Sequence, residues 1–448
     1  MRFQKSFFQM MSVVLVLLTV VSCKKNNGDD EAVTPPANTV ISGTLNQSMT
    51  LTADKQWTLK GYVYVPAGVT LTVEAGTTIV SDVTDKGALC VERGGKLIAN
   101  GTANKPIVFT SGKAAGSRAP GDWGGVVLLG KATTNRSSTP VIEGGLDRQY
   151  GGTDDNDNSG SLKYVRIEYA GIAAFPNSEI NGLTLGGVGR GTTLDHIQIV
   201  YGNDDSYEFF GGTVDAKYLV AYATADDDYD FDFGYRGRIQ FAVALRDPAF
   251  VDPADAGNGV ESDNDGTGTA ATPVTHPVLS NFTWIGPNNA SGTLTNHNYG
   301  NRWRRATQFE VYNSVMLGWQ KGGFSIESNE SAQAYKDGIS KFKNNVIHSN
   351  LASDVARLGS VTVLTKAELD TKVAADGNTV LTSPDNVLTA PFNLTSPNFA
   401  PVAAGPAASG ASFTGLDNTF FTTTTYKGAI GANDNWLQGW TRFPAKGQ

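Results

Sequence analysis

The sequence has almost no cysteine: Cys23 and Cys90 are the only two among its 448 residues. A small extracellular scaffold held together by several disulfides is therefore excluded, and the stability of the fold must come from packing. Cys90 lies in the strand-like run 88–91, where we expect a buried, unreactive thiol. If Cys23 is chemically modified, as its position indicates, no intramolecular disulfide can form at all.

Histidine and net positive charge are also scarce. The four histidines, at 196, 276, 297 and 348, have no spacing typical of metal ligands, which argues against a zinc site. Lys and Arg number 35 against 43 Asp and Glu, so the chain carries a formal charge of -8. Because sequence-independent affinity for nucleic acid rests on Lys and Arg, we expect no nucleic-acid partner.

A hydrophobic run long enough to span a bilayer is missing from the N-terminus. The apolar run 13–21 is shorter than the roughly 20 residues that a membrane span needs. The run comes after the basic residues Arg2 and Lys5 and is followed by the small residue Ser22, which predicts a removable signal peptide over residues 1–22. The junction with Cys23 resembles the lipobox of bacterial signal peptidase II and implies a lipid on Cys23. The alternative is an ordinary secretory peptide with an incidental cysteine.

Residues 23–40 have no apolar periodicity. Charged residues at 24–31 are followed by a proline-containing stretch at 34–39, a composition typical of a flexible tether. A charged, acid-containing segment after a lipidated cysteine resembles the surface-export signal of Bacteroidetes lipoproteins. The resemblance implies an outer-membrane protein that is anchored through its N-terminal lipid and faces the cell exterior.

Helical periodicity is nearly absent before residue 360, whereas glycine is abundant, with 51 residues. Short apolar runs at 69–73, 126–129 and 239–245 end in Gly, Asn and Asp, which predicts an all-β chain of many short strands. The segments 196–209 and 218–231 match at an offset of 22 residues. One coil of a parallel β-helix fits this period, whereas a propeller needs blades of roughly 40 residues.

Asparagine recurs at the same place in a second set of similar segments. Three asparagines stand beside short apolar runs at offsets of about thirty residues. They are Asn281, Asn313 and Asn345. We expect a stacked asparagine ladder at a turn of the solenoid, with side-chain amides joining consecutive coils. The solenoid is predicted to occupy residues 41–360.

Several segments resemble the right-handed β-helix lipoproteins of Bacteroidetes, a mostly uncharacterised part of the pectin-lyase-like superfamily. They lie at residues 69–79, 94–99, 121–125, 179–185 and 435–440. The resemblance implies an all-β, single-stranded right-handed parallel β-helix. It also implies a protein of the outer-membrane surface that is often encoded near TonB-dependent receptors, so that such a receptor is an expected partner.

The last part of the chain, residues 361–448, differs from the coils. Thr365 and Glu368 have the spacing of a capping box and predict a helix that ends near Gly377. Pro- and Ala-rich sequence follows, with Trp436 and Trp440 near its end. We expect the helix and this segment to cover one end of the solenoid, where coils expose unpaired backbone, in preference to a sugar-binding role for the two tryptophans.

The run 226–234 is the most unusual segment of the chain. Side chains alternate between faces along a strand, so Tyr229, Phe231 and Phe233 should share a core-facing side. Asp228, Asp230 and Asp232 should then share the opposite side. With the offset of 22 residues, Glu208 lies directly beneath Asp230, about 4.8 Å away. Two carboxylates at that distance repel by about 3.5 kcal/mol at an effective dielectric constant of 20, so a compensating group is expected.

Three kinds of compensation remain open from the sequence. The first is an acidic ladder paired with arginines, for which Arg236 and Arg238 are the nearest candidates. The second is a Ca²⁺ site, because Ca²⁺ prefers several carboxylate oxygens. Its candidate ligands are Glu208, Asp228, Asp230 and Asp232. The third is a proton shared between two acids, which would raise the pKa of one of them. Paired acids of this kind also leave catalysis open, as in a polysaccharide lyase or glycoside hydrolase. The candidate catalytic acids are Asp205, Glu208, Asp228 and Asp230.

The sequence leaves three functions open. The leading hypothesis is a non-catalytic surface lipoprotein that binds a glycan or another extracellular ligand, or assists an outer-membrane receptor. It assumes that aromatic residues are exposed for stacking, with Tyr201, Phe210, Tyr235 and Trp319 as candidates. The enzyme is the first alternative, although the chain lacks the Gly-His-Gly element of such hydrolases and a lysine after the Arg238–Ile239 pair. A structural or adhesive protein is the second.

Overall fold

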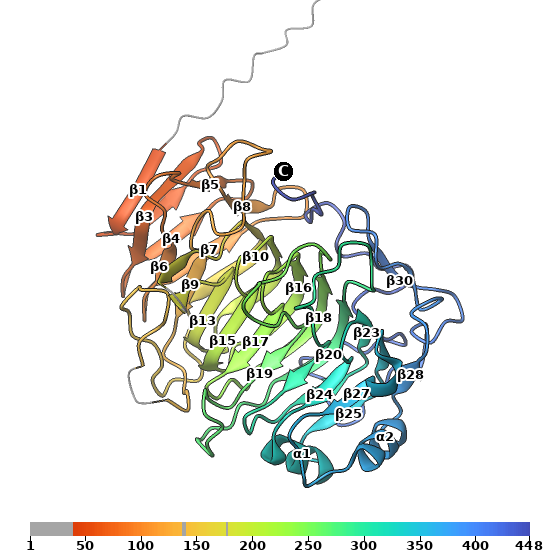
Figure 1. The fold of residues 1–448 in the computed structure, drawn as a ribbon. Coiled ribbons are helices and arrows are strands. Elements are labelled where there is room, and N and C mark those ends of the chain that lie inside the picture. The colour runs from red at the N-terminus through yellow and green to blue at the C-terminus, as the bar shows by residue number, and fades with distance from the viewer. Residues whose placement is uncertain (1–38, 137–139, 176–177) are drawn as a thin grey trace, which may run out of the picture. The chain divides into compact units, whose positions relative to one another are not determined.

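The computed structural model describes residues 39–136, 140–175 and 178–448. The predicted signal peptide, Cys23 and nearly all of the tether lie outside these residues. Within them the chain winds as a single-stranded right-handed parallel β-helix, as predicted, with each coil contributing to three parallel sheets (Figure 1). The helices of the described residues are too short and too polar to cross a membrane.

Sheet 1 is the sheet that carries the acidic run. Its strands are β1 (Thr39–Thr44), β3 (Trp57–Val65), β6 (Leu89–Val91), β9 (Val126–Leu129), β13 (Leu183–Val188), β15 (Tyr207–Gly212), β17 (Tyr229–Asp232), β19 (Glu261–Ser262), β21 (Arg302–Trp303), β24 (Phe324–Ile326) and β27 (Ala356–Leu358). The strands pair in parallel and in coil order, because each coil returns to the same sheet one level further along.

Sheet 2 follows sheet 1 in each coil. Its strands are β2 (Met49–Leu51), β4 (Thr70–Val73), β7 (Lys96–Asn100), the first parts of β10 (Gly160–Glu168), β14 (Thr193–Val200), β16 (Ala216–Tyr222), β18 (Arg238–Leu245) and β20 (Val278–Ile285), and then β22 (Glu310–Tyr312) and β25 (Lys341–Lys343). The five long strands continue into sheet 3 after a bend of one residue.

Sheet 3 closes each coil. It contains the first parts of β1 and β3, the second parts of the five long strands, and β5 (Thr78–Ser81), β8 (Ile107–Thr110), β23 (Val315–Trp319), β26 (Val346–Ser349) and β28 (Thr379–Leu381). Two short antiparallel pairs lie outside the coils. They are β11 (Ala173–Phe175) with β12 (Ser178–Glu179), and β29 (Leu388–Ala390) with β30 (Asn398–Pro401).

One residue in the left-handed conformation makes the bend between sheets 2 and 3 in seven consecutive coils. These residues are Tyr164, His196, Tyr218, Phe241, Asn281, Asn313 and Asn344. Asn adopts the left-handed backbone readily, whereas the same conformation is unfavourable in free energy for an aromatic residue. The rings of the first coils offset it by stacking, with 4.3 Å between the centroids of Tyr164 and His196 and between those of His196 and Tyr218.

The predicted asparagine ladder is only partly continuous. Asn281 accepts a hydrogen bond from Gln240 of the preceding coil, and Asn345 donates to Asn378 of the following one. Asn313 bonds mainly with the backbone of Ser412 in the C-terminal segment. The column therefore joins the coils to a covering segment as well as to one another.

The interior of the solenoid is filled by apolar side chains from all three sheets. Tyr229 and Phe231 are fully buried there and pack on Tyr207 and Phe209 of the preceding coil, each pair 5.1 Å apart. Phe233 does not share this face, contrary to the alternation predicted for it. The strand β17 ends at Asp232, and the left-handed backbone of Phe233 turns its side chain to a separate cluster outside the main core.

The predicted C-terminal helix is confirmed as α2 (Lys366–Ala375), with a complete capping box at Thr365 and Glu368. Its Leu369 and Val373 are buried in the main core, so the helix covers the last coils. A further helix, α1 (Asn329–Lys336), and the 3-10 helix η1 (Ala352–Asp354) were not expected. The buried side of α1 consists mostly of small residues, which give no helical apolar pattern.

The segment after α2 covers a flank of the solenoid and not its end, which corrects our expectation. It runs back along the outer face of sheet 3 and brings the C-terminus beside the early coils (Figure 1). Trp440 is fully buried there, and its carbonyl accepts a hydrogen bond from Arg166. The outer face of sheet 3 is apolar, with Val200, Val220 and Leu317 among its buried residues, so it needs a cover.

Candidate functional site

A row of acidic side chains stands on the outer face of sheet 1. Strand pairing places Glu208 of β15 next to Asp230 of β17, and Asp230 next to Glu261 of β19. The stacking of Glu208 and Asp230 predicted from the repeat is thus confirmed. In the following coil the same position holds Arg302, which ends the run of acids.

Further acids come from the loops that lead into these strands. Asp204 and Asp205 precede β15, and Asp226 and Asp227 precede β17 in the next coil. The Oδ1 atom of Asp205 accepts a hydrogen bond from the backbone N–H of Asp227 at 2.7 Å. The Oδ1 atom of Asp227 accepts in turn from the N–H of Asn258, so the acidic loops are fastened to one another from coil to coil.

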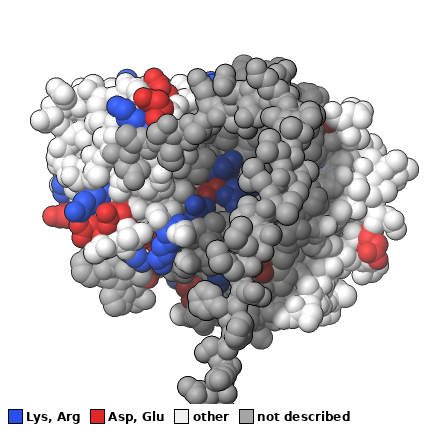
Figure 2. Space-filling view, turned by 90° about the horizontal axis from the view of Figure 1, so that it is seen from above, with Lys and Arg blue, Asp and Glu red and all other residues white. Residues whose placement is uncertain are grey.

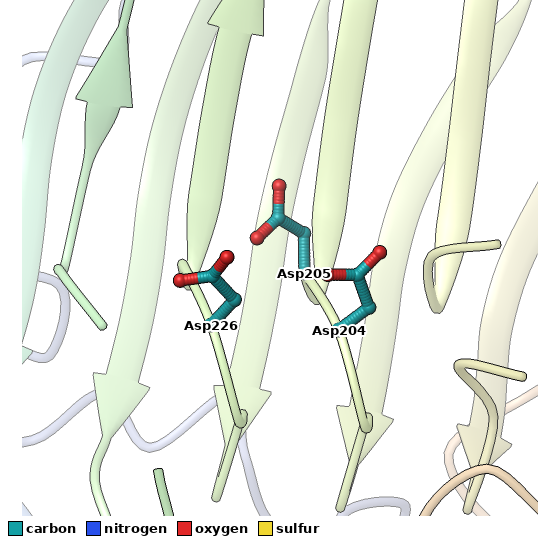
Figure 3. A group of neighbouring side chains, drawn as sticks. All are labelled: Asp204, Asp205 and Asp226. Carbon is teal, nitrogen blue, oxygen red and sulfur yellow. The ribbon is translucent and has the colours of Figure 1, made fainter. Parts of the chain in front are cut away.

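Five of these acids form two groups that share one member. Carboxylate oxygens of Asp205, Glu208 and Asp230 lie within 4.8 Å of one another, and so do those of Asp204, Asp205 and Asp226. Figure 3 shows the second group, with Asp205 between the other two. Asp205 and Glu208 are only 6% and 8% exposed, so the groups are not a fringe of solvated surface acids. We call these five residues the acidic site.

Burial and mutual repulsion both oppose ionisation of the acidic site. Desolvation raises the pKa of Glu208 well above its usual range, and the neighbouring charges of Glu143, Asp205 and Asp230 raise it further. The pKa values of Asp205 and Asp230 are raised in the same way, first by burial and then by nearby acids. In the absence of a positive group, the site therefore holds protons at pH values where an exposed carboxyl is ionised.

Asn181 and Glu143 border the acidic site. The Asn181 amide donates a hydrogen bond to Glu208, and only 1% of the residue is exposed. Its Oδ1 atom is buried without a hydrogen-bond partner in the described part of the chain. Glu143, from the long connection between β9 and β10, lies close enough to Glu208 for its negative charge to raise the pKa of Glu208. The amide oxygen is thus a neutral oxygen donor beside the carboxylates.

Asp228 has a different role from the acidic site. It forms a salt bridge of 3.1 Å with Arg246, and both side chains are fully buried. Burial raises the pKa of Asp228 to about 7 despite the arginine beside it. Arg246 also donates to the backbone carbonyls of Thr224, Asp226 and Asn258, which fixes the loops on either side of β17. Asp228 is enclosed by this network and has no exposed surface.

Arginines neutralise the acids in the coils after Asp230. Arg302 and Arg304 both pair with Glu261, and Arg304 also holds Asp263 at 2.9 Å. The arginines expected from the sequence to pair with the ladder, Arg236 and Arg238, turn elsewhere. Arg236 pairs with Asp155, while Arg238 pairs with Asp215 and Asp417. No salt bridge to Lys or Arg in the described ranges reaches any member of the acidic site.

The candidates from the sequence are therefore divided by the structure. Asp205, Glu208 and Asp230 come together, whereas Asp228 and Asp232 belong to neither group. Asp232 pairs in register with Phe210, and it accepts a hydrogen bond from the N–H of Phe233. Asp204 and Asp226 were not among the predicted site residues, although their recurrence at the 22-residue offset was a usable signal. Nothing in the sequence pointed to Glu143 or Asn181.

A family model for pectate-lyase-like β-helix domains matches residues 43–441, which includes nearly the whole solenoid and most of the C-terminal segment. The chain belongs to the pectate-lyase-like β-helix family. No curated protein and no solved structure gives a significant match. The family agrees with the three parallel sheets, and it leaves the choice between a binding and a catalytic role open.

The aromatic residues that we expected on the surface of this β-helix are all buried. Tyr201, Phe210, Tyr235 and Trp319 are between 0% and 4% exposed, so they do not form a stacking surface for sugars. Each packs in an apolar cluster, because the large apolar side chains fill the inside of the coils or lie under the segments that cover them.

A cavity of about 400 Å³ lies beside the acidic site. Glu143, Tyr150, Phe233 and Arg136 are among the residues that line it. Glu143 links the cavity to the acidic site, because its charge acts on Glu208. A small group bound in this cavity would therefore lie next to the carboxylates.

Elsewhere the surface charges of the pectate-lyase-like β-helix are mixed. On the face drawn in Figure 2, the visible Lys and Arg side chains lie beside Asp and Glu side chains and form no broad patch of one sign.

Proposed function

We propose that the protein is a cell-surface β-helix that binds a glycan or a similar extracellular ligand through a Ca²⁺ ion held by Asp205, Glu208 and Asp230. The observation that carries this proposal is the convergence of three carboxylates within 4.8 Å, none of which forms a salt bridge with Lys or Arg within the ranges that the structure describes. A family whose description refers to pectate lyase supports a carbohydrate-related role.

Ca²⁺ fits the chemistry of the donors. It prefers hard oxygen ligands, several of them carboxylates, and tolerates irregular geometry. The acidic site supplies carboxylate oxygens, and the unpartnered Oδ1 atom of Asn181 adds a neutral one nearby. A bound cation would replace the protons that the raised pKa values keep on the site. It would also give the ligand an electrophilic contact in place of the aromatic surface that the fold buries.

The cellular setting of the proposal comes from the N-terminus. We propose that residues 1–22 are removed, that Cys23 carries the lipid, and that the β-helix stands on the outer face of the outer membrane. A TonB-dependent receptor is the proposed neighbour. Replacing Cys23 with Ser should release the protein from the membrane fraction and change its mobility in gels, and unchanged association would contradict the lipid anchor.

Calorimetric titration with Ca²⁺ tests the site directly. The mature protein should bind Ca²⁺ with measurable heat, and Asp230→Asn should weaken that binding at least tenfold. Asp54→Asn is the matched control, because Asp54 is exposed and lies far along the chain from the acidic site. Equal heats for wild type and Asp230→Asn, or no heat for either, would remove the cation.

A glycan array tests the ligand. Binding is expected in Ca²⁺, and it should be lost in a chelator and in the Asp230→Asn variant. The Asp54→Asn control should bind as wild type does. Binding that is indifferent to the chelator would contradict a role for the cation, and a complete lack of binders would favour a structural or adhesive protein.

A glycoside hydrolase or polysaccharide lyase is the second candidate. The raised pKa values of Asp205, Glu208 and Asp230 favour it, since a general acid must stay protonated near neutral pH. Asp228 is a poor candidate for direct contact with a substrate because it is fully buried with Arg246. Release of reducing ends or unsaturated products from polysaccharides, abolished by Asp230→Asn, would establish the enzyme.

A further inference from the structure

We propose that a cavity in the C-terminal segment binds one uncharged sugar residue without the help of a cation. The cavity has a volume of about 400 Å³, and its polar wall consists of Thr425, Tyr426, Asn433 and Asp434. It is formed by the segment that covers the outer face of sheet 3, whereas the acidic site stands on the outer face of sheet 1. The inference therefore goes beyond the proposed function and does not rest on it.

The polar side chains of the cavity wall are free to bind a ligand. Within the ranges that the structure describes, none of the four has a hydrogen-bond or salt-bridge partner for its side chain. Together they offer two hydroxyl groups, an amide and a carboxylate. The hydroxyl groups of a sugar both donate and accept hydrogen bonds, so a mixed set of donors and acceptors suits them. The rest of the wall is small and mainly apolar, as the C–H faces of a sugar ring require. It consists of Pro401, Ala403, Ala408, Gly431 and Ala432.

Tyr426 gives the cavity an aromatic wall. Its ring is half-buried, and Gly431 lies so close to the ring that a Cβ atom at that position would be 2.7 Å from Cε1 of Tyr426. Burial, helped by the charge of Asp434, raises the pKa of the Tyr426 hydroxyl to about 12. The hydroxyl therefore remains a hydrogen-bond donor at neutral pH. An aromatic ring with a polar edge can contact both the apolar face and a hydroxyl group of one sugar.

The charge of the wall favours an uncharged ligand. Asp434 is exposed and forms no salt bridge with any residue that the structure describes, and the lining of the cavity includes neither Lys nor Arg. A neutral sugar can donate its hydroxyl groups to this carboxylate in charge-assisted hydrogen bonds. The carboxylate of a uronic acid would instead be repelled by Asp434. The cavity should therefore discriminate against acidic sugars.

Hydrogen bonds to the solenoid fix the wall of the cavity. The side-chain amide of Asn281 donates to the carbonyl of Tyr426 at 3.3 Å, and the N–H of Gly428 donates to the carbonyl of Asn313 at 2.7 Å. Asn281 and Asn313 are two of the residues that make the bend between sheets 2 and 3. The position of Tyr426 is thus set by the coils. A wall that is ordered before binding loses little conformational entropy when the ligand enters.

Saturation-transfer NMR in solution tests the cavity. A site for one sugar residue binds with a Kd of about 1 mM or weaker, which does not survive the washing of an array. The neutral probes are the methyl glycosides of glucose, galactose and mannose, and the acidic probes are those of glucuronic and galacturonic acid. With the mature protein in chelator, at least one neutral probe should give saturation transfer, and the acidic probes should give none.

Variants assign the signal to the cavity. Tyr426→Ala should raise the Kd of the neutral probe about tenfold, and Asp434→Asn should raise it roughly threefold. Tyr62→Ala is the matched control, because Tyr62 is also half-buried but lies in β3, outside the cavity, and it should leave the Kd unchanged. Asp434 is exposed and unpaired within the described residues, so its replacement should leave the circular dichroism of the protein as it is in wild type.

Three results would overturn the site. They are no saturation transfer from any neutral probe, a signal that is unchanged in both Tyr426→Ala and Asp434→Asn, and a stronger signal from the acidic probes than from the neutral ones. None of them would affect the Ca²⁺ titration of the proposed function. Loss of Ca²⁺ binding would likewise leave this site intact, because the probes are measured in chelator.

Discussion

Replacing Asp230 with Asn should make the metal-free protein more stable while it weakens Ca²⁺ binding. The substitution keeps the shape of the side chain and removes one negative charge from the acidic site. Asp230 lies within 4.8 Å of Asp205 and Glu208 and pairs in register with Glu261, so its charge has several unfavourable neighbours.

The size of the effect follows from the distances. A single pair of charges at 4.8 Å costs about 3.5 kcal/mol at an effective dielectric constant of 20. The acids avoid part of this cost by binding protons, because burial and neighbouring charges raise the pKa of Asp230. We therefore expect Asp230→Asn to raise the free energy of unfolding by about 2 kcal/mol at pH 8 and by much less at pH 5.

Protonation of Asp230 makes the stability of the folded protein depend on pH. The folded protein raises the pKa of Asp230 above its value in the unfolded chain, so the folded state binds the proton more tightly. The stability that this group contributes is complete below the unfolded pKa of about 3.9 and is lost as the pH rises through the folded pKa. Wild type should therefore lose stability from pH 5 to pH 8, and Asp230→Asn should lose less.

Urea unfolding followed by tryptophan fluorescence measures both effects, because several of the seven tryptophans are fully buried. Ca²⁺ at a hundred times its dissociation constant should stabilise wild type by about 2.7 kcal/mol. A variant that binds tenfold more weakly should gain only about 1.4 kcal/mol, so the difference in stability between the two proteins should narrow by about 1.3 kcal/mol. The reasoning would be refuted if Asp230→Asn were less stable than wild type in chelator at pH 8. That result would mean that the carboxylate already makes a favourable contact in the metal-free state.

Three further predictions concern other parts of the fold. Arg246→Met should lower the free energy of unfolding by about 3–5 kcal/mol, since Asp228 would remain buried without a partner. Adding Asp228→Asn should recover part of that loss in a double-mutant cycle, and simple additivity would contradict the pairing. Burial alone would raise the pKa of Glu310, but hydrogen bonds, including one from Lys341, lower it to about 2. The stabilisation that Glu310 contributes is present above pH 4.5 and is lost as the pH falls through about 2. Glu310→Gln should therefore lower the free energy of unfolding by about 1–3 kcal/mol at pH 7 and by very little at pH 2. Urea unfolding at the two pH values would measure the difference. Cys90 is fully buried, and burial raises the pKa of its thiol to about 12. A thiol reagent should therefore modify Cys90 only after unfolding, and labelling of the native protein would refute this prediction.

The repeat in the sequence predicted more of the site than any motif did. The offset of 22 residues placed Glu208 beneath Asp230, and the structure has that register. The prediction worked because parallel coils of equal length stack residue on residue. It failed at Phe233, where strand alternation was extended one residue beyond the end of β17.

Other parts of the site could not be predicted because they depend on contacts between distant segments. Glu143 reaches Glu208 from a long connection that lies outside the repeat. Arg246 directly follows the end of β18, and only the three-dimensional winding brings it to Asp228. The arginines nearest to the acids in sequence form salt bridges with other residues, Arg236 with Asp155 and Arg238 with Asp215.

By itself, the sequence determined the parallel β-helix, the capping box of α2 and the burial of Cys90, because each follows from local periodicity or from neighbours one coil away. Only the tertiary structure decided which acids form salt bridges with arginine and which do not, and where the C-terminal segment lies. Both depend on which faces remain uncovered after the coils have stacked, and uncovered faces are a property of the assembled fold and not of any one stretch of chain.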